Sequence, residues 1–211
     1  MARVRRLNTQ FDTGLVWFRR DLRSTDQAAL YYALKHCRRV WCVFVFDTAI
    51  LQPILETWRG RQPDRTPEDR RVEFILAALE ELDQVLRQRG GGLIVLHDDA
   101  RAAIPALAEQ LEVEAVFTNH DYEPAALERD DAVREVLAEK GRELITFKDQ
   151  VIFERDEILT GQGKSFTVFT PYKNAWLKQL TAFDLKPYPV ETYPMTVIPA
   201  ASSCCIPVTK F

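Results

Sequence analysis

The chain has 211 residues, of which 46% are hydrophobic and 28% are charged, enough to bury one good core but hardly two. Its formal net charge of -3 and pI near 5.7 give no overall attraction for a phosphate backbone, so nucleic-acid binding by this chain alone is not expected. No apolar run is long enough to span a bilayer, and the basic N-terminal arm (residues 1–12) has no apolar segment behind it, which predicts a cytoplasmic protein without membrane contact.

The first predicted strand, residues 14–18, is an apolar run that ends abruptly in Arg19, Arg20 and Asp21. A strand that is buried on both faces of a sheet has such a continuous apolar sequence. Ligands of open α/β sheets bind beyond the carboxyl ends of these strands. Charged residues therefore gather where a ligand would bind.

Four more apolar runs have the length of a strand, and the segments between them carry apolar residues every three or four positions, as amphipathic helices do. These runs are residues 40–46, 93–97, 115–118 and 144–147. The alternation predicts an α/β domain over residues 13–148. We expect a Rossmann-like, doubly wound, five-stranded parallel sheet in the order 3-2-1-4-5, with helices on both faces.

The two clearest helices are predicted over residues 67–89 and 124–140. Thr66 and Asp69 approximate a capping box before the first helix, and Gly90 suits the left-handed residue after its end. Gly141 is expected to stop the second helix. The apolar stripe of the first helix consists of Val72, Ile75, Leu76, Leu79, Leu82 and Leu86.

After residue 148 the alternation stops. Residues 149–180 have the pattern of a linker that ends in a short helix, and residues 181–211 contain five prolines and no glycine, which is typical of an unpacked tail. The aromatic residues of the linker recur every three or four positions, which favours a core-facing or interdomain stripe over a ring-stacking site. They are Phe166, Phe169, Tyr172 and Trp176.

The predicted strand order makes the first and fourth strands neighbours, so their carboxyl ends flank one crevice and the end of the second strand lies beside it. The crevice would gather Arg19, Arg20, Phe46, Asp47, Thr48, Asn119, Asp121 and Glu123. The alternative is that these arginines and carboxylates only pair with one another at solvated loop ends.

The sequence gives little support for a phosphate-binding loop, a zinc site or a catalytic nucleophile. No GxGxxG or P-loop sequence is present, and Gly90, Gly91 and Gly92 precede a strand, as a turn would. The four cysteines form no zinc-like cluster, and Cys42 is expected in the core. No nucleophile elbow accompanies the histidines, of which only His120 lies beside the crevice.

Several motifs in register resemble the DNA photolyase and cryptochrome family, over residues 14 to about 180. They are LVWFRRDLRSTDQAAL (15–30), VFVFDTAIL (43–51), RRVEFILAALEEL (70–82), VFTNHDYEPAALERDDAV (116–133), KDQVIFE (148–154) and GKSFTVFTPYKNAWLK (163–178). The resemblance is to the N-terminal α/β domain of that family, which binds a light-harvesting antenna chromophore.

The resemblance also implies which chromophore is bound. Arg71, Asp121 and Glu123 match the family's deazaflavin-binding pattern, whereas Ala125 and Ala126 replace an Asn-Glu pair of folate-binding members. An 8-hydroxy-5-deazaflavin or flavin antenna is therefore expected in preference to methenyltetrahydrofolate. The residues expected to bind it are Phe18, Arg19, Arg20, Phe46, Asp47, Thr48, Arg71, Asn119, Asp121 and Glu123. No metal ligand and no catalytic residue is predicted.

Family members continue into a larger helical domain that holds FAD and takes in a flipped pyrimidine dimer, which the reduced FAD splits by donating an electron. No sequence resembling that domain follows residue 180. The expectation is therefore a truncated, light-gathering part that contacts DNA only through an FAD-bearing domain or partner chain and is not catalytic by itself. The alternative is a non-catalytic cryptochrome-like or nucleotide-binding module with a sensory role.

Overall fold

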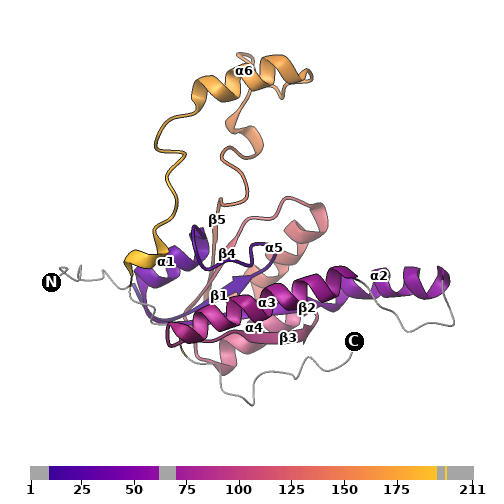
Figure 1. The fold of residues 1–211 in the computed structure, drawn as a ribbon, viewed down its shortest axis with the longest axis vertical. Coiled ribbons are helices and arrows are strands. Elements are labelled where there is room, and N and C mark those ends of the chain that lie inside the picture. The colour runs from indigo at the N-terminus through magenta and orange to yellow at the C-terminus, as the bar shows by residue number, and fades with distance from the viewer. Residues whose placement is uncertain (1–9, 62–69, 194–197, 199–211) are drawn as a thin grey trace.

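The structure is a computed structural model that describes residues 10–61, 70–193 and 198. Five parallel strands form one sheet in the order β3-β2-β1-β4-β5, with helices on both faces (Figure 1). The strands are β1 (Phe11–Phe18), β2 (Cys37–Asp47), β3 (Ile94–Asp98), β4 (Ala115–Asn119) and β5 (Glu143–Phe147). The helices are α1 (Ala28–His36), α2 (Thr48–Arg61), α3 (Arg70–Gln88), α4 (Ala100–Gln110), α5 (Pro124–Glu139) and α6 (Phe169–Gln179), with short 3-10 turns η1 (Arg155–Glu157) and η2 (Val190–Thr192). The predicted fold class and strand order are confirmed.

Strand β1 lies at the centre of the sheet, and successive side chains along it enter different cores. Val16 and Phe18 pack with residues of α1 and α3, while Leu15 and Trp17 pack with residues of α4 and α5. All four are at most 2% exposed. Burial on both faces is why this strand has no alternation of apolar and polar residues.

The predicted ends of the two clearest helices are confirmed where the structure describes them. Gly90 has φ 89° after α3, and the amide of Gly91 donates to the carbonyl of Leu86 at 2.8 Å. Gly141 has φ 70° after α5. Thr66 and the proposed capping box lie outside the described residues. On α3 the stripe is buried at Leu79, Leu82 and Leu86 and half-buried at Val72, Ile75 and Leu76.

Helix α2 begins at the point where β2 ends. The amide of Ala49 donates to Oδ1 of Asp47 at 3.0 Å, which satisfies a free donor at the start of this helix. Pro53 lies inside α2 and interrupts its sequence pattern, which is why that pattern does not reveal the helix. Thr48 is consequently the first residue of a helix and lies beyond the end of the strand.

Beyond β5 the chain forms an arm, residues 148–193, that leaves the sheet, carries α6 and returns to α1 (Figure 1). No residue of α6 is buried, so its aromatic residues do not face a core in the part of the chain that is described. The returning end does pack, because Val190 is fully buried and the rings of Tyr188 and Tyr193 lie 5.7 and 5.4 Å from Tyr31. Residues 188–193, part of the segment expected to be an unpacked tail, are therefore packed against α1. The sequence did not show this because irregular packing of rings leaves no periodic pattern.

Within the ranges that the structure describes, none of the helices is both long and apolar enough to cross a membrane.

Candidate functional site

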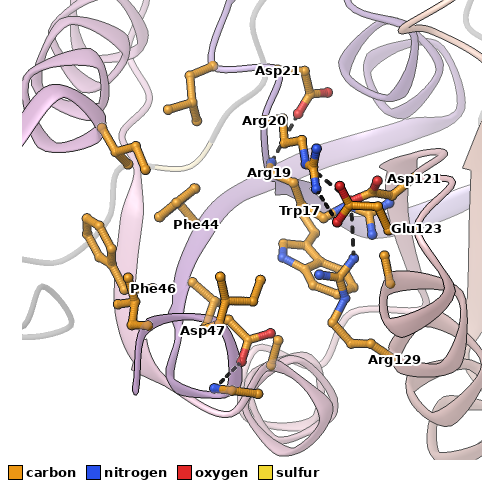
Figure 2. A pocket seen from close by; sticks show the side chains of 18 of the residues that line it. Trp17, Arg19, Arg20, Asp21, Phe44, Phe46, Asp47, Asp121, Glu123 and Arg129 are labelled. Carbon is orange, nitrogen blue, oxygen red and sulfur yellow. Dashed lines mark hydrogen bonds and ion pairs between the residues drawn. The ribbon is translucent and has the colours of Figure 1, made fainter. Parts of the chain in front are cut away.

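A cavity of about 730 Å³ opens at the carboxyl ends of β1 and β2, a size typical of small-molecule sites (Figure 2). Helices α2 and α3, the first turn of α4 and the first two turns of α5 complete its wall. The large apolar side chains along it include Trp17, Phe44, Phe46, Ile50, Leu51 and Phe74. Phe74 and Ile50 are 76% and 53% exposed, so two apolar side chains stand at the open part of the cavity.

Charged side chains from the loops after β1 and β4 and from α5 line another part of the cavity (Figure 2). The guanidinium of Arg20 lies 3.5 Å from Oδ2 of Asp121 and 2.7 Å from Oε2 of Glu123. Arg20 is 56% exposed, whereas Asp121 is only 6% exposed. The alternative interpretation was that these arginines and carboxylates only pair with one another at loop ends. The ion pairs are present, but the same side chains also line a cavity.

Trp17 lies in the wall between two arginines. The guanidinium carbons of Arg19 and Arg129 are 4.9 and 5.1 Å from the centre of its ring, within the range of cation–π attraction. Both guanidinium groups bind Asp130: Nη1 of Arg19 donates to its two oxygens at 2.7 and 2.9 Å, and Nη2 of Arg129 donates to Oδ1 at 3.0 Å. Burial lowers the pKa of Arg19 from its ordinary value, and the charge of Asp130 opposes that effect.

The loop after β1 is held by a network around the carboxylate of Asp21. It accepts hydrogen bonds from the amide of Arg19 at 3.0 Å, from Nε2 of Gln27 at 2.8 Å and from Nδ2 of Asn119. Oδ1 of Asn119 in turn accepts the amide of Ala29, in the first turn of α1. These groups tie together β1, β4 and α1, so the arginines after β1 start from a fixed backbone.

The arm is joined to the same edge of the sheet by Asp149. Its carboxylate accepts the amide of Ala28 at 3.0 Å and a hydrogen bond from Arg23 at 2.7 Å. Burial raises the pKa of Asp149 above its ordinary value, against the effect of these two donors.

Six of the ten predicted binding residues line the cavity, and four do not. Those that line it are Arg19, Arg20, Phe46, Asp47, Asp121 and Glu123. Of the others, Phe18 is fully buried in the core with α1 and α3, and Asn119 is 3% exposed and bonded to α1. Thr48 begins α2, and Arg71 is an exposed residue of α3.

His120, the histidine expected beside the crevice, is part of a separate cluster. Its Nδ1 lies 2.9 Å from Glu154, and its Nε2 lies 3.0 Å from the hydroxyl of Thr146. Tyr122 also donates to Glu154, at 2.7 Å. Desolvation opposes ionisation of Glu154, but the hydrogen bonds from His120 and Tyr122 outweigh it and keep the pKa of Glu154 below its ordinary value. The cluster holds the arm against β4 and β5.

Sequence reasoning missed Trp17, Arg129 and Asp130 as residues of the site. The sequence did carry a signal for two of them, because Arg129 and Asp130 occupy the inward face of α5 between Ala126 and Val133. A charged pair within an apolar stripe of helical period indicates buried partners. Trp17 was missed because it belongs to the continuous apolar run of β1, in which no residue stands out as facing a cavity.

Comparison with known proteins identifies relatives of the chain. Residues 14–194 match the family model described as DNA photolyase. A deoxyribodipyrimidine photo-lyase of Synechococcus sp. is 35% identical over 178 residues, which cover 84% of this chain and 34% of that protein. An uncharacterized 31.6 kDa protein of another Synechococcus strain is also 35% identical, over 83% of this chain and 58% of that protein. The chain thus spans about a third of the length of the photolyase and somewhat more than half of the shorter relative.

Solved structures of related fold are also similar to this chain. An archaeal photolyase from Sulfolobus tokodaii is similar with a TM-score of 0.60 at 30% identity, over 77% of this chain and 34% of that one. That structure holds two FAD molecules and is described as implying a novel light-harvesting cofactor. A cryptochrome from Synechocystis sp. has the same fold, with a TM-score of 0.67 at 20% identity over 90% of this chain and 38% of that one.

Proposed function

Because the chain belongs to the DNA photolyase family, we propose that its cavity binds an antenna chromophore whose excitation passes to the FAD of a photolyase-type helical domain. The chemistry served would be the light-driven repair of pyrimidine dimers, the activity for which the photo-lyase relatives are named. Contact with DNA would be made by the helical domain, since this chain carries a net charge of -3.

The cavity itself is the observation that carries this proposal. Its volume of about 730 Å³ suits a tricyclic ring system with a side chain, and its walls combine aromatic side chains with a few polar groups. Phe44 and Phe46 would contact the ring system, and Asp121 and Glu123 would bind its polar edge. Such an arrangement orients a flat, conjugated molecule by hydrogen bonds at one side and by dispersion over the remainder.

The wall favours a deazaflavin or flavin over a folate. Ala125 and Ala126, which stand where folate-binding members have Asn and Glu, both line the cavity. Two methyl groups there offer a pterin ring no hydrogen bond, and a buried polar edge without a partner costs binding free energy. The flavin content of the similar archaeal photolyase agrees with this preference.

The proposal is tested by titrating the purified protein with 8-hydroxy-5-deazariboflavin, FMN and 5,10-methenyltetrahydrofolate, with ligand fluorescence as the readout. We expect the deazaflavin or FMN to bind and to remain with the protein in gel filtration, with an absorption band in the near ultraviolet or blue. Binding of the folate alone would show that the choice of chromophore is wrong.

A pair of variants on α3 tests whether the ligand binds in the cavity. Ala78 lines it, whereas the preceding Ala77 is exposed. Ala78→Phe fills part of the space and is expected to weaken binding by at least about tenfold, the effect of losing roughly 1.4 kcal/mol of contact free energy. Ala77→Phe adds the same ring to the same helix away from the cavity and should bind like the wild type. Equal affinities of the two variants would place the ligand elsewhere.

A further inference from the structure

One wall residue of the cavity has a chemistry that conflicts with light harvesting. Trp17 lines the cavity and is 2% exposed, so a bound ring system would lie close to its indole. Indole is the most easily oxidised of the common aromatic side chains, and an excited flavin or deazaflavin is a far stronger oxidant than the same molecule in its ground state. An unprotected tryptophan at this place would quench the chromophore that the site serves.

The quenching step is a simple electron transfer. One electron leaves the indole for the excited chromophore, which gives an indole radical cation and a chromophore radical anion. Return of the same electron restores both molecules and releases the excitation as heat. No net reaction occurs, but the energy is lost before it reaches an acceptor.

Two cations beside Trp17 oppose this step. The guanidinium carbons of Arg19 and Arg129 lie 4.9 and 5.1 Å from the ring centre, and each of these side chains is only 9% exposed (Figure 2). Arginine stays protonated in proteins, so both groups are permanent cations. With little water to screen them, their charges act on the indole more strongly than surface charges would.

The two cations disfavour oxidation of the indole through their effects on its ground state and on its radical cation. In the ground state they are attracted to the electron-rich ring. In the radical cation that attraction is replaced by repulsion between like charges. Asp130 binds both guanidinium groups through their N–H atoms, with distances of 2.7 to 3.1 Å, and so fixes them beside the ring. Its negative charge, and that of Asp121 at 3.9 Å from Arg129, offset part of the positive charge, but the guanidinium groups are the charges that lie against the ring.

We propose that Arg19 and Arg129 insulate the excited chromophore from Trp17 by preventing one-electron oxidation of its indole. This inference rests on the proposed antenna function and assigns to the two arginines a role beyond support of the fold. Trp17 can then form a large, rigid wall for the ring system without quenching its excited state.

The test measures the fluorescence lifetime of protein-bound 8-hydroxy-5-deazariboflavin or FMN, a quantity that does not depend on how much of the protein is occupied. Arg129→Met removes one cation at similar side-chain length and should shorten the bound lifetime several-fold. Adding Trp17→Phe to Arg129→Met removes the electron donor and should restore the lifetime. Arg134→Met is the matched control, because it removes an exposed guanidinium from the same helix, outside the cavity wall, and should leave the lifetime unchanged.

A measurement on the wild-type protein keeps the test independent of how the variants fold. Transient absorption after a short light pulse should show no indole radical cation in the wild type and should show one, together with the chromophore radical anion, in Arg129→Met. A radical pair in the wild type, or equal lifetimes of wild type and Arg129→Met with the probe bound, would overturn the inference. Failure of the two probes and of the folate to bind the wild type is seen separately in the titration and would refute the antenna function, and this inference with it.

Discussion

Arg19 and Arg20 are adjacent in the chain and have opposite environments. The side chain of Arg19 is 9% exposed and donates to Asp130, whereas that of Arg20 is 56% exposed and lies 2.7 Å from Glu123. An exposed ion pair contributes little to stability because water and salt screen it. A buried ion pair differs, because loss of one partner leaves a charge without water and without compensation.

Two substitutions test this contrast at the residue scale. Asp130→Asn removes the charge that two buried guanidinium groups share, so we expect the free energy of unfolding to fall by about 3 kcal/mol. Glu123→Gln weakens only the exposed pair and should cost less than about 1 kcal/mol. Urea denaturation of the two variants and the wild type measures both effects. Similar losses for the two variants would show that burial does not set the strength of these pairs.

At the scale of elements, the arm is the part that local pattern describes least well. It is joined to the sheet by polar contacts at Asp149 and at the cluster of His120, Tyr122 and Glu154, and by the packing of Val190. The polar contacts connect residues that are 32 to 126 positions apart in the chain. Helix α6, which has no buried residue, is therefore held in place through the ends of the arm.

The cluster around Glu154 makes the attachment of the arm depend on pH. The pKa of Glu154 is lower in the folded protein than its ordinary value of 4.5, so its contribution to stability is fully present above that pH and is lost as the pH falls through the folded-state pKa. Glu154→Gln should cost on the order of 1 kcal/mol at neutral pH, because it weakens hydrogen bonds to a charged acceptor. The difference in free energy of unfolding between wild type and variant should then shrink below pH 4.5.

Urea denaturation at neutral and at acid pH measures this difference. Glu139→Gln, an exposed position at the end of α5, is the control and should show no such dependence. A difference that stays constant with pH would mean that the charge of Glu154 does not attach the arm.

At the scale of the whole molecule, a single sheet separates two cores. Residues of α1 and α3 cover one face, and residues of α4 and α5 cover the other. The central strands β1 and β2 contribute to both cores. Gly14 shows how closely they pack, since a Cβ built there would lie 2.5 Å from Sγ of Cys37 and 3.0 Å from Cε2 of Phe117. Cys37 and Cys42 both lie in the core with α1 and α3, so access to them requires that side of the sheet to open.

The two buried thiols report this opening. Cys37 and Cys42 are fully buried, and burial raises the pKa of Cys37 to about 12 and that of Cys42 still further. We expect iodoacetamide at mildly alkaline pH to leave both unmodified in the folded protein and to modify both in concentrated urea, because only the exposed thiolate reacts.

Peptide mapping by mass spectrometry measures each cysteine separately, including Cys204 and Cys205, which lie outside the described residues. Rapid modification of Cys42 in the absence of denaturant would show that β2 opens without global unfolding. A bound chromophore should raise the urea concentration at which the two thiols become modified, since a ligand of the folded state suppresses unfolding.

The sequence by itself determined the strands, their parallel order and the edge of the sheet where the site lies. Continuous apolar runs such as residues 14–18 can be buried only on both faces, and the rules of parallel connections leave few orders for five such strands. The charged residues that follow β1 and β4 were therefore placed together correctly, and both Arg20 and Asp121 line the cavity.

The tertiary structure decided which side chains face the cavity, which pair with one another and which enter a core. Phe18 and Trp17 are neighbours, yet the alternation of β1 puts Phe18 in the core with α1 and α3 and leaves Trp17 beside the cavity. Asp130 meets Arg19 across 111 positions of the chain, and Val190 is buried without any periodic pattern. Such contacts depend on how the helices pack on the sheet. Hydrophobic periodicity describes each element alone, so it can mark a residue as buried but does not say which residue it contacts.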